Sequence, residues 1–205
     1  MKLHRTLLIA ATLLLTTSRV WGGPEDTHLG MGLTYLKLSD IHPSVASDSA
    51  PVVNVMLGSR GPHAAGDLVL SYAKFNGNGE ATAEPYYPAT DVTYLAVDSV
   101  FRIYFRNTET HRVLPWVSLG GGVHFLGLEG AYYPNYGYQL IGGAGIDITL
   151  NETAYLRLGG QGRYYSVRDY WLVERTHGGA VGFDITVIWI IPETLGDRPK
   201  DGGVS

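Results

Sequence analysis

The stretch from Gly178 to Ile191, GGAVGFDITVIWII, decides the fold of this chain. Every second residue from Val181 to Ile191 is apolar, and the residues between them begin small or polar, as at Gly182, Asp184 and Thr186. Successive side chains of a β-strand point to opposite faces of a sheet. Alternation over this length therefore predicts a strand with one wholly apolar face and a different environment on the other.

Much of the remaining chain repeats this pattern. Seven earlier segments alternate in the same way, namely His28–Leu38, Val52–Ser59, Gly66–Phe75, Val92–Arg106, Trp116–Leu126, Tyr138–Leu150 and Ala154–Tyr165. The connections between the eight segments alternate between long and short, which is typical of outer-membrane barrels with long external loops and short periplasmic turns. The sequence thus predicts an all-β protein, an eight-stranded antiparallel up-and-down transmembrane β-barrel over residues 23–191.

The two ends of the chain are expected to lie outside the barrel. Residues 1–22 resemble a cleaved signal peptide, because Lys2 and Arg5 precede the apolar run Leu7–Leu15 and small residues end at Gly22. That run is too short for a membrane helix, and no later run approaches the ~18 apolar residues that such a helix needs. A membrane-spanning mature protein must then be a closed barrel, since only helices and closed barrels satisfy every backbone polar group in hydrocarbon. Residues 192–205 are predicted to form a disordered tail, which an even number of strands places in the periplasm.

Composition excludes several classes of function. The chain of 205 residues contains no cysteine, which excludes disulfides and thiolate metal sites. Without residues 1–22, which hold three of the 15 basic residues and none of the 19 acidic ones, the formal charge changes from −4 to −7. This acidic balance gives little support to a nucleic-acid partner. The seven histidines are scattered, so we expect neither a metal site nor a cofactor.

The apolar face of the predicted strands is expected to contact lipid. It is free of charge in the fourth, sixth and eighth segments, and the opposite face carries glycine, aspartate, arginine, tyrosine and threonine rather than the lysine and glutamate of a wetted exterior. Glycine also suits the crowded inward face of a narrow eight-stranded barrel. Five apolar residues fall on the polar face and oppose this interpretation: Met56, Val69, Leu126, Ile188 and Ile190. A soluble lipocalin-like barrel with its apolar face inward is the alternative.

The polar face is expected to form a charge network inside the barrel. Its charged members are Asp98, Arg102, Arg106, Asp147, Arg157, Arg163 and Asp184. An isolated buried charge is costly, so these groups must be paired or hydrated. Asp147 and Arg157 lie opposite one another across the short turn at Asn151 and Glu152, and we predict that they form a pair. A structural network of ion pairs is the expected interior, with a narrow ion-conducting path as the alternative.

Aromatic residues are predicted to form two bands around the barrel. Tyr35, Tyr72, Tyr138 and Tyr164 lie near the long loops, whereas Phe105, Trp116 and Trp189 lie near the short turns. Such girdles mark the two membrane interfaces of outer-membrane barrels. The alternative explanation is the ordinary preference of aromatic residues for strands.

Taken together, these features resemble the small outer-membrane barrels of the OmpA/OmpX type. The resemblance rests on the signal peptide, the eight strands and the glycine-rich stretches Gly143-Ala144-Gly145 and Gly160-Gln161-Gly162. It implies residence in the outer membrane of a Gram-negative bacterium, contact with outer-membrane lipid and lipopolysaccharide, and insertion by the barrel-assembly machinery. That machinery typically reads a strand ending in an aromatic residue at the very C-terminus, whereas here Trp189 and Ile191 are followed by a tail.

Catalytic candidates are weak, so we expect a non-enzymatic barrel with a structural or surface-interaction role. His42-Pro43-Ser44 has the His-x-Ser spacing of one lipid A deacylase family, but that family carries its motif on a late strand. His124 shares a face with Ser118 and has no evident third partner. A narrow channel for small solutes, a lipid A-modifying enzyme and the soluble barrel are the alternatives. The candidates for contacting a surface partner or lipopolysaccharide are Tyr86, Tyr87, Tyr132, Tyr133, Tyr136, Tyr170 and Trp171.

Overall fold

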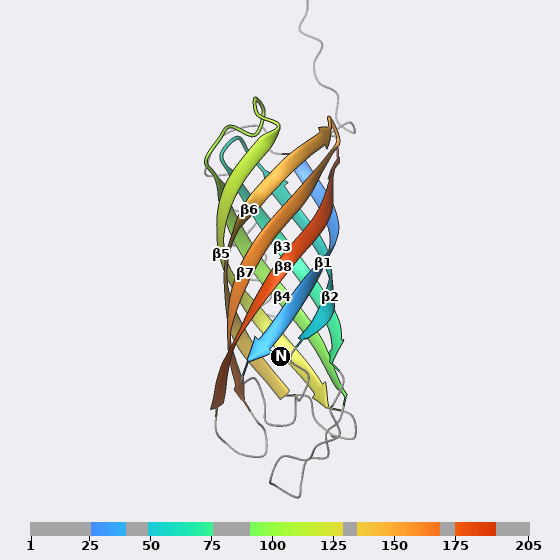
Figure 1. Ribbon diagram of the computed structural model, residues 1–205, viewed down its shortest axis with the longest axis vertical. Coiled ribbons are helices and arrows are strands. Elements are labelled where there is room, and N and C mark those ends of the chain that lie inside the picture. The colour runs from blue at the N-terminus through green and yellow to red at the C-terminus, as the bar shows by residue number, and fades with distance from the viewer. Residues whose placement is uncertain (1–25, 40–48, 76–90, 129–134, 169–174, 192–205) are drawn as a thin grey trace, which may run out of the picture.

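The computed structural model describes residues 26–39, 49–75, 91–128, 135–168 and 175–191. In these ranges the chain forms eight strands, each antiparallel to its neighbours, which close into one barrel when β8 pairs with β1 (Figure 1). The strands are β1 (Asp26–Ser39), β2 (Ser49–Arg60), β3 (Ala64–Phe75), β4 (Val92–Tyr104), β5 (Val113–Leu128), β6 (Asn135–Asn151), β7 (Ala154–Arg168) and β8 (Arg175–Ile191). The expected signal peptide and C-terminal tail lie outside the described residues.

No helix among the described residues is long and apolar enough to cross a membrane.

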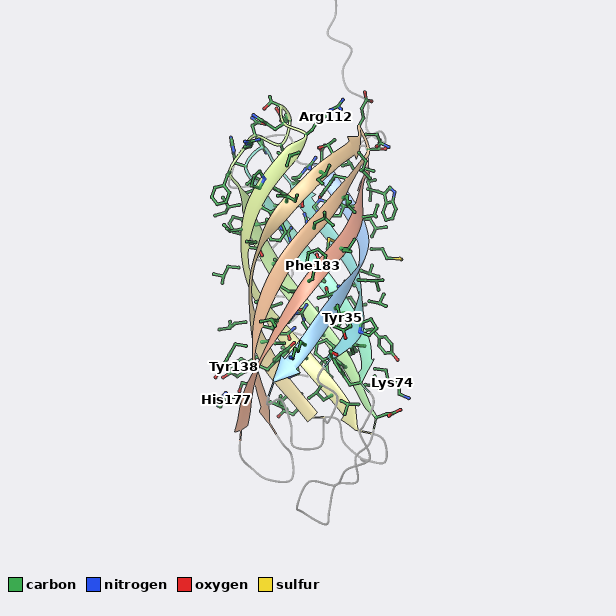
Figure 2. The ribbon with its side chains drawn as sticks, in the orientation of Figure 1. Tyr35, Lys74, Arg112, Tyr138, His177 and Phe183 are labelled. Atoms are coloured by element: carbon green, nitrogen blue, oxygen red, sulfur yellow. The ribbon has the colours of Figure 1, made fainter. Side chains whose placement is uncertain are left out.

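The barrel is apolar on its outside. In β4, buried side chains such as Tyr94 and Asp98 alternate with Leu95 and Phe101, each 40% exposed. All eight strands contribute large apolar side chains to the outer surface, and Figure 2 shows them projecting from the ribbon, with Phe183 near the middle. The two-residue period of a strand sends the opposite set of side chains inward. The orientation expected from the sequence, apolar face outward, is therefore the one observed.

The five apolar residues that opposed this orientation lie inside the barrel. Met56, Val69, Leu126 and Ile188 are buried and Ile190 is partly buried. No bulge displaces them, because the register shift among the described strand pairs falls between Thr149 and Asn151. They belong to apolar clusters that fill the interior between its polar groups. We call these the loop-end cluster (including Leu36, Phe75, Tyr94, Leu126 and Tyr165), the middle cluster (Met56, Val69, Val100, Ile141, Tyr155 and Ile188) and the turn-end cluster (Ala65, Tyr104, Leu114 and Trp116).

The two ends of the barrel differ in their connections. At the turn end, residues 61–63, 105–112 and 152–153 join the strands; at the loop end, residues 40–48, 76–91, 129–134 and 169–174 do so. Residues 105–112 form a longer connection than 129–134 or 169–174, so the expected strict alternation of long and short is not kept. The later strands are longer, and they take up residues that would otherwise belong to the loops between them. β5 to β8 have 15 to 17 residues, whereas β1 to β4 have 12 to 14.

Backbone hydrogen bonds hold the longest turn against its neighbour. The backbone nitrogen of Thr108 donates to the carbonyl of Pro62 at 3.0 Å, and that of Tyr104 donates to the carbonyl of His63 at 2.9 Å. The Thr108 hydroxyl adds a hydrogen bond to the carbonyl of Gly61 at 3.2 Å. The turn end is thus tied together outside the strand ladder.

Candidate functional site

The interior of the barrel contains a polar network centred on Arg157, which is fully buried in β7. Its Nε donates to Asp147 Oδ1 at 2.9 Å and its Nη2 donates to Asp147 Oδ2 at 3.0 Å. Its Nη1 reaches Asp67 Oδ2 at 3.2 Å. Two-pronged pairing of a guanidinium with a carboxylate is among the strongest hydrogen-bonding arrangements in proteins. The predicted pair of Asp147 and Arg157 is therefore present, as Cα partners of adjacent strands.

Asp67 binds three donors and was missing from the expected network. Besides Arg157 it pairs with Arg102 from β4, and His28 Nε2 lies 2.6 Å from its Oδ1. Asp67 lies on the inward side of its strand together with Ser71, and this alternation was the available signal. Its partners could not be inferred, because Arg102 and Arg157 lie 35 and 90 positions away in the chain.

Trp116 lies inside the barrel, so its assignment to the turn-side aromatic band was wrong. It is 4% exposed, and its Nε1 donates to Asp147 Oδ1 at 2.9 Å. Gly145 and Gly159 make room for the indole, since a Cβ at either position would lie 2.6 Å from the ring. The band was assigned by residue type and depth, whereas the alternation of β5 places position 116 on the inward face with Ser118. The turn-side network thus comprises His28, Asp67, Arg102, Tyr104, Trp116, Asp147 and Arg157, with Tyr104 donating to Asp147 at 2.8 Å.

A second network is centred on Arg163, nearer the loop end. Arg163 Nη1 donates to the Tyr94 hydroxyl at 2.9 Å and lies 3.5 Å from Asp98 Oδ2, and its Nε donates to Gln161 Oε1 at 3.2 Å. The Tyr94 hydroxyl donates to Gln139 Oε1 at 2.9 Å, and Gln139 Nε2 donates to Asp98 Oδ1 at 2.5 Å. These bonds close a ring of side chains around Asp98.

Asp184 joins this second network through hydroxyl and amide groups. Thr34 Oγ1 donates to Asp184 Oδ1 at 2.9 Å and accepts from Asn54 Nδ2 at 2.7 Å and from Gln161 Nε2 at 3.1 Å. The Ser71 hydroxyl donates to Asn54 Oδ1 at 2.8 Å. The loop-side network therefore comprises Thr34, Asn54, Ser71, Tyr94, Asp98, Gln139, Gln161, Arg163 and Asp184.

A small cavity of mixed lining lies where the two networks meet the middle cluster. Its volume is about 50 Å³, and its lining includes Asp98 and Asp184 from one network and Arg102 and Trp116 from the other. That volume suits a few water molecules and no larger solute. Apolar clusters lie toward both ends of the barrel from this cavity.

Six of the seven expected network residues lie inside the barrel. Asp98, Arg102, Asp147, Arg157 and Arg163 are buried and Asp184 is partly buried. Arg106 is exposed, because β4 ends at Tyr104 and the chain has already entered the turn, so its placement in the interior was wrong.

The other six residues of the expected aromatic bands are exposed on the outer surface. Tyr35, Tyr72, Tyr138 and Tyr164 lie on loop-end halves of their strands, and Phe105 and Trp189 lie at the turn end. Figure 2 shows Tyr35 and Tyr138 on the opposite half of the barrel from Arg112. The Tyr164 hydroxyl is within 2.8 Å of His177 Nδ1, and the two rings stack.

The described residues give little support to catalysis. His124 is fully buried, neither of its ring nitrogens has a hydrogen-bond partner, and it packs against Tyr94 and Tyr165 rather than a nucleophile. Within the described ranges, no group of three or more His, Asp or Glu side chains is arranged to hold a metal ion. The His42-Pro43-Ser44 motif lies outside the described residues, and so do the loop aromatics apart from Tyr136, which is exposed on β6.

Comparison with known proteins supports the fold and no closer relationship. No protein-family model and no curated protein sequence matches this chain. The crystal structure of Neisserial surface protein A (NspA) is similar with a TM-score of 0.61 and 14% identity, over 82% of this chain and 100% of that one. The outer membrane protein OprG from Pseudomonas aeruginosa is similar with a TM-score of 0.51 and 14% identity, over 82% of this chain and 95% of that one. The expected resemblance to small outer-membrane barrels is therefore confirmed at the level of the fold.

Proposed function

We propose that the protein is an integral outer-membrane β-barrel with a structural or surface-interaction role, whose interior is closed to solutes. The observation that carries this proposal is the inversion of polarity: leucine, phenylalanine and valine face outward, whereas Asp67, Asp147 and Arg157 are fully buried. Soluble proteins bury apolar residues and seldom expose contiguous apolar patches larger than a few hundred Å². Around this barrel the apolar surface spans all eight strands, which suits hydrocarbon as the surrounding solvent.

The height of the apolar surface fits a membrane. Tyr164 pairs with Gly179, and Trp189 lies further along the same strand at the turn end. Strands rise about 3.3 Å per residue and tilt by about 40° in such barrels, so the two aromatic levels lie roughly 25 Å apart along the axis. That separation is close to the apolar band of outer-membrane barrels. We assign these levels to the two membrane interfaces.

The asymmetry of the ends suggests an orientation. Among the described outward-facing side chains of the strands, the Lys, Arg, Asp and Glu residues are Lys37 and Lys74, both at the loop end. Lysine side chains near the end of a membrane-spanning element extend to the interface. We place the loop end at the cell surface, where its aromatic-rich loops would meet lipopolysaccharide or a surface partner. The turn end and the C-terminal tail would face the periplasm, after removal of a signal peptide and insertion by the barrel-assembly machinery.

A channel function is less well supported than a closed barrel. The cavity between the two networks has a volume of about 50 Å³, and apolar clusters lie toward both ends of the barrel. A conducting path would require several ion pairs to separate at once, which leaves buried charges uncompensated. The lipid A-modifying alternative has weaker support: among the described residues, the hydroxyl groups of Thr110 and Tyr164 contact the exposed histidines His111 and His177 at 2.8 Å, and no carboxylate pairs with either histidine.

Two measurements on outer-membrane fractions test the proposal. We expect the unboiled protein to migrate faster than the boiled protein on a gel, because a closed barrel resists the detergent. Reconstituted in a planar bilayer, it should give no unitary conductance across voltages. Recovery in the soluble periplasm without a band shift would contradict membrane residence, and reproducible conductance steps would contradict the closed interior.

A further inference from the structure

A shallow groove crosses the outer face of the barrel from β5 to β1. One row of residues marks its course, because Leu119, Gly142, Gly162, Val181 and Lys37 are successive Cα partners across five neighbouring strands. Leu119 and Val181 stand out from the surface, with 71% and 64% of their area exposed. The two glycines between them carry no side chain, so the surface is recessed there.

The recess has the size of a ligand site. Its volume is about 640 Å³, within the ~300–1,000 Å³ range of small-molecule pockets. A Cβ at Gly142 or Gly162 would meet no atom within 4 Å, so the space above both glycines is open. Leu140 and Tyr164 form the side of the groove nearer the loop end. The groove is therefore apolar along most of its length.

The loop end of the groove is cationic. Lys37 is exposed and lines it, and no ion pair or hydrogen bond joins its side chain to another described residue. Lys74, the other outward lysine, is paired with Asp91 at 2.7 Å. Tyr164 and its partner His177 lie at the same end of the barrel, and no Asp or Glu lines the groove. An apolar recess with one ammonium at its end complements an amphiphile with an anionic head.

We infer that this groove binds one lipid molecule with an anionic phosphate headgroup, its acyl chain lying over Gly142 and Gly162 and its phosphate at Lys37. The inference rests on the proposed membrane residence. Charge complementarity selects the lipid over a second copy of the chain. A two-fold interface is self-complementary, so it would bring two Lys37 ammonium groups to one surface without a groove-lining acid to neutralise them.

Native mass spectrometry of the detergent-solubilised barrel, titrated with dioleoyl phosphatidylglycerol, tests the inference. Lys37→Ala should weaken binding about fivefold, the loss expected for one lysine at an anionic lipid surface. The double variant Gly142→Val and Gly162→Val should also weaken it severalfold, because the valines fill the recess at two positions where an added Cβ meets no atom within 4 Å. Dioleoyl phosphatidylcholine has the same chains and no net charge. It should bind the wild type more weakly than phosphatidylglycerol does, whereas Lys37→Ala should bind the two lipids with equal affinity.

Two matched variants serve as controls. Gly160→Val lies on the outer face of β7 outside the groove lining, and its Cβ would first meet an atom at 3.9 Å. Lys74→Ala removes an ammonium that Asp91 already neutralises. Both should bind phosphatidylglycerol like the wild type.

The outcomes separate this inference from the proposal on which it rests. The heat-modifiable band is first checked in the wild type and in each variant. Its absence in the wild type would contradict membrane residence itself, whereas its presence in a variant shows that the variant still forms a closed barrel. With the band intact, equal binding by wild type, Lys37→Ala and the double valine variant would overturn the lipid site. A dimer that the double valine variant abolishes would also overturn it, in favour of a second copy.

Discussion

Arg157 Nη1 and Asp67 Oδ2 lie 3.2 Å apart although their strands, β7 and β3, stand on opposite walls of the barrel. Three strands separate β3 from β7 in either direction around the closed sheet. The contact therefore braces the barrel across its diameter, in addition to the hydrogen bonds that hold each strand to its neighbours. Both groups are fully buried, so water cannot replace this ion pair by hydrating Arg157 and Asp67 unless the barrel opens.

Replacing Arg157 with leucine should destabilise the barrel strongly. The change leaves Asp147 without its two-pronged partner, and removing one member of a buried ion pair typically costs about 3–5 kcal/mol. Urea unfolding in lipid vesicles measures this loss. Arg106→Leu is the matched control, because Arg106 is exposed in a turn and its loss should cost less than about 0.5 kcal/mol. A loss below about 1 kcal/mol for Arg157→Leu would show that the network contributes little.

Gly159→Ala should be destabilising because of Trp116. The added methyl group would lie 2.6 Å from the indole ring, and forcing extra volume into a packed interior typically costs about 1–3 kcal/mol. Trp116→Leu in the same chain should remove much of that cost, so the two changes should be non-additive. Gly162→Ala, which meets no atom within 4 Å, should unfold at the wild-type urea concentration. Additivity of the two interior changes would mean that the indole does not occupy this space.

Tryptophan fluorescence should separate the inside of the barrel from its outside. A variant whose sole tryptophan is Trp189, exposed at the turn end, should be quenched by brominated lipids. A variant whose sole tryptophan is Trp116, buried beside Asp147, should be quenched far less. The other tryptophans are replaced by phenylalanine in both. Equal quenching would indicate that Trp116 faces lipid, as a member of the aromatic band that the sequence suggested.

His28 and His124, both buried, should respond oppositely to replacement by leucine. His124 has both ring nitrogens buried without a partner, so His124→Leu should leave stability unchanged or raise it by about 1–2 kcal/mol. His28→Leu removes a donor from the buried carboxylate of Asp67 and should cost about 1–3 kcal/mol. Urea unfolding of the two variants side by side measures the difference. A large loss for His124→Leu would indicate that its ring is hydrogen-bonded.

The sequence determined the fold more completely than the interior. Alternation in β8 sufficed for the strand and for its apolar outer face, since a period of two residues is local information. The pair of Asp147 and Arg157 was also within reach, because a short turn fixes which residues of adjacent strands face one another. Contacts across the barrel, such as that between Arg157 and Asp67, depend on closure of the whole sheet.

The errors have the same origin. Arg106 continued the alternation of its segment, but β4 ends at Tyr104, and the turn that follows is held to the neighbouring turn by the bond from the Thr108 nitrogen to the Pro62 carbonyl. Trp116 looked like an interfacial residue by type, yet glycines on β6 and β7 open a space for it inside. In both cases the deciding neighbour belongs to a strand or turn far along the chain.

The contacts of Arg157 also make the charge balance of the interior depend on the presence of β7. Its guanidinium binds groups carried by β2, β3, β4 and β6, including Met56 Sδ at 3.5 Å and the Tyr104 hydroxyl at 3.2 Å. A sheet that lacks β7 holds Asp67 and Asp147 with Arg102 as the sole guanidinium of the turn-side network. Addition of β7 supplies the second guanidinium and neutralises that excess charge. The turn-side network is thus electrically balanced only in a sheet that already contains β7.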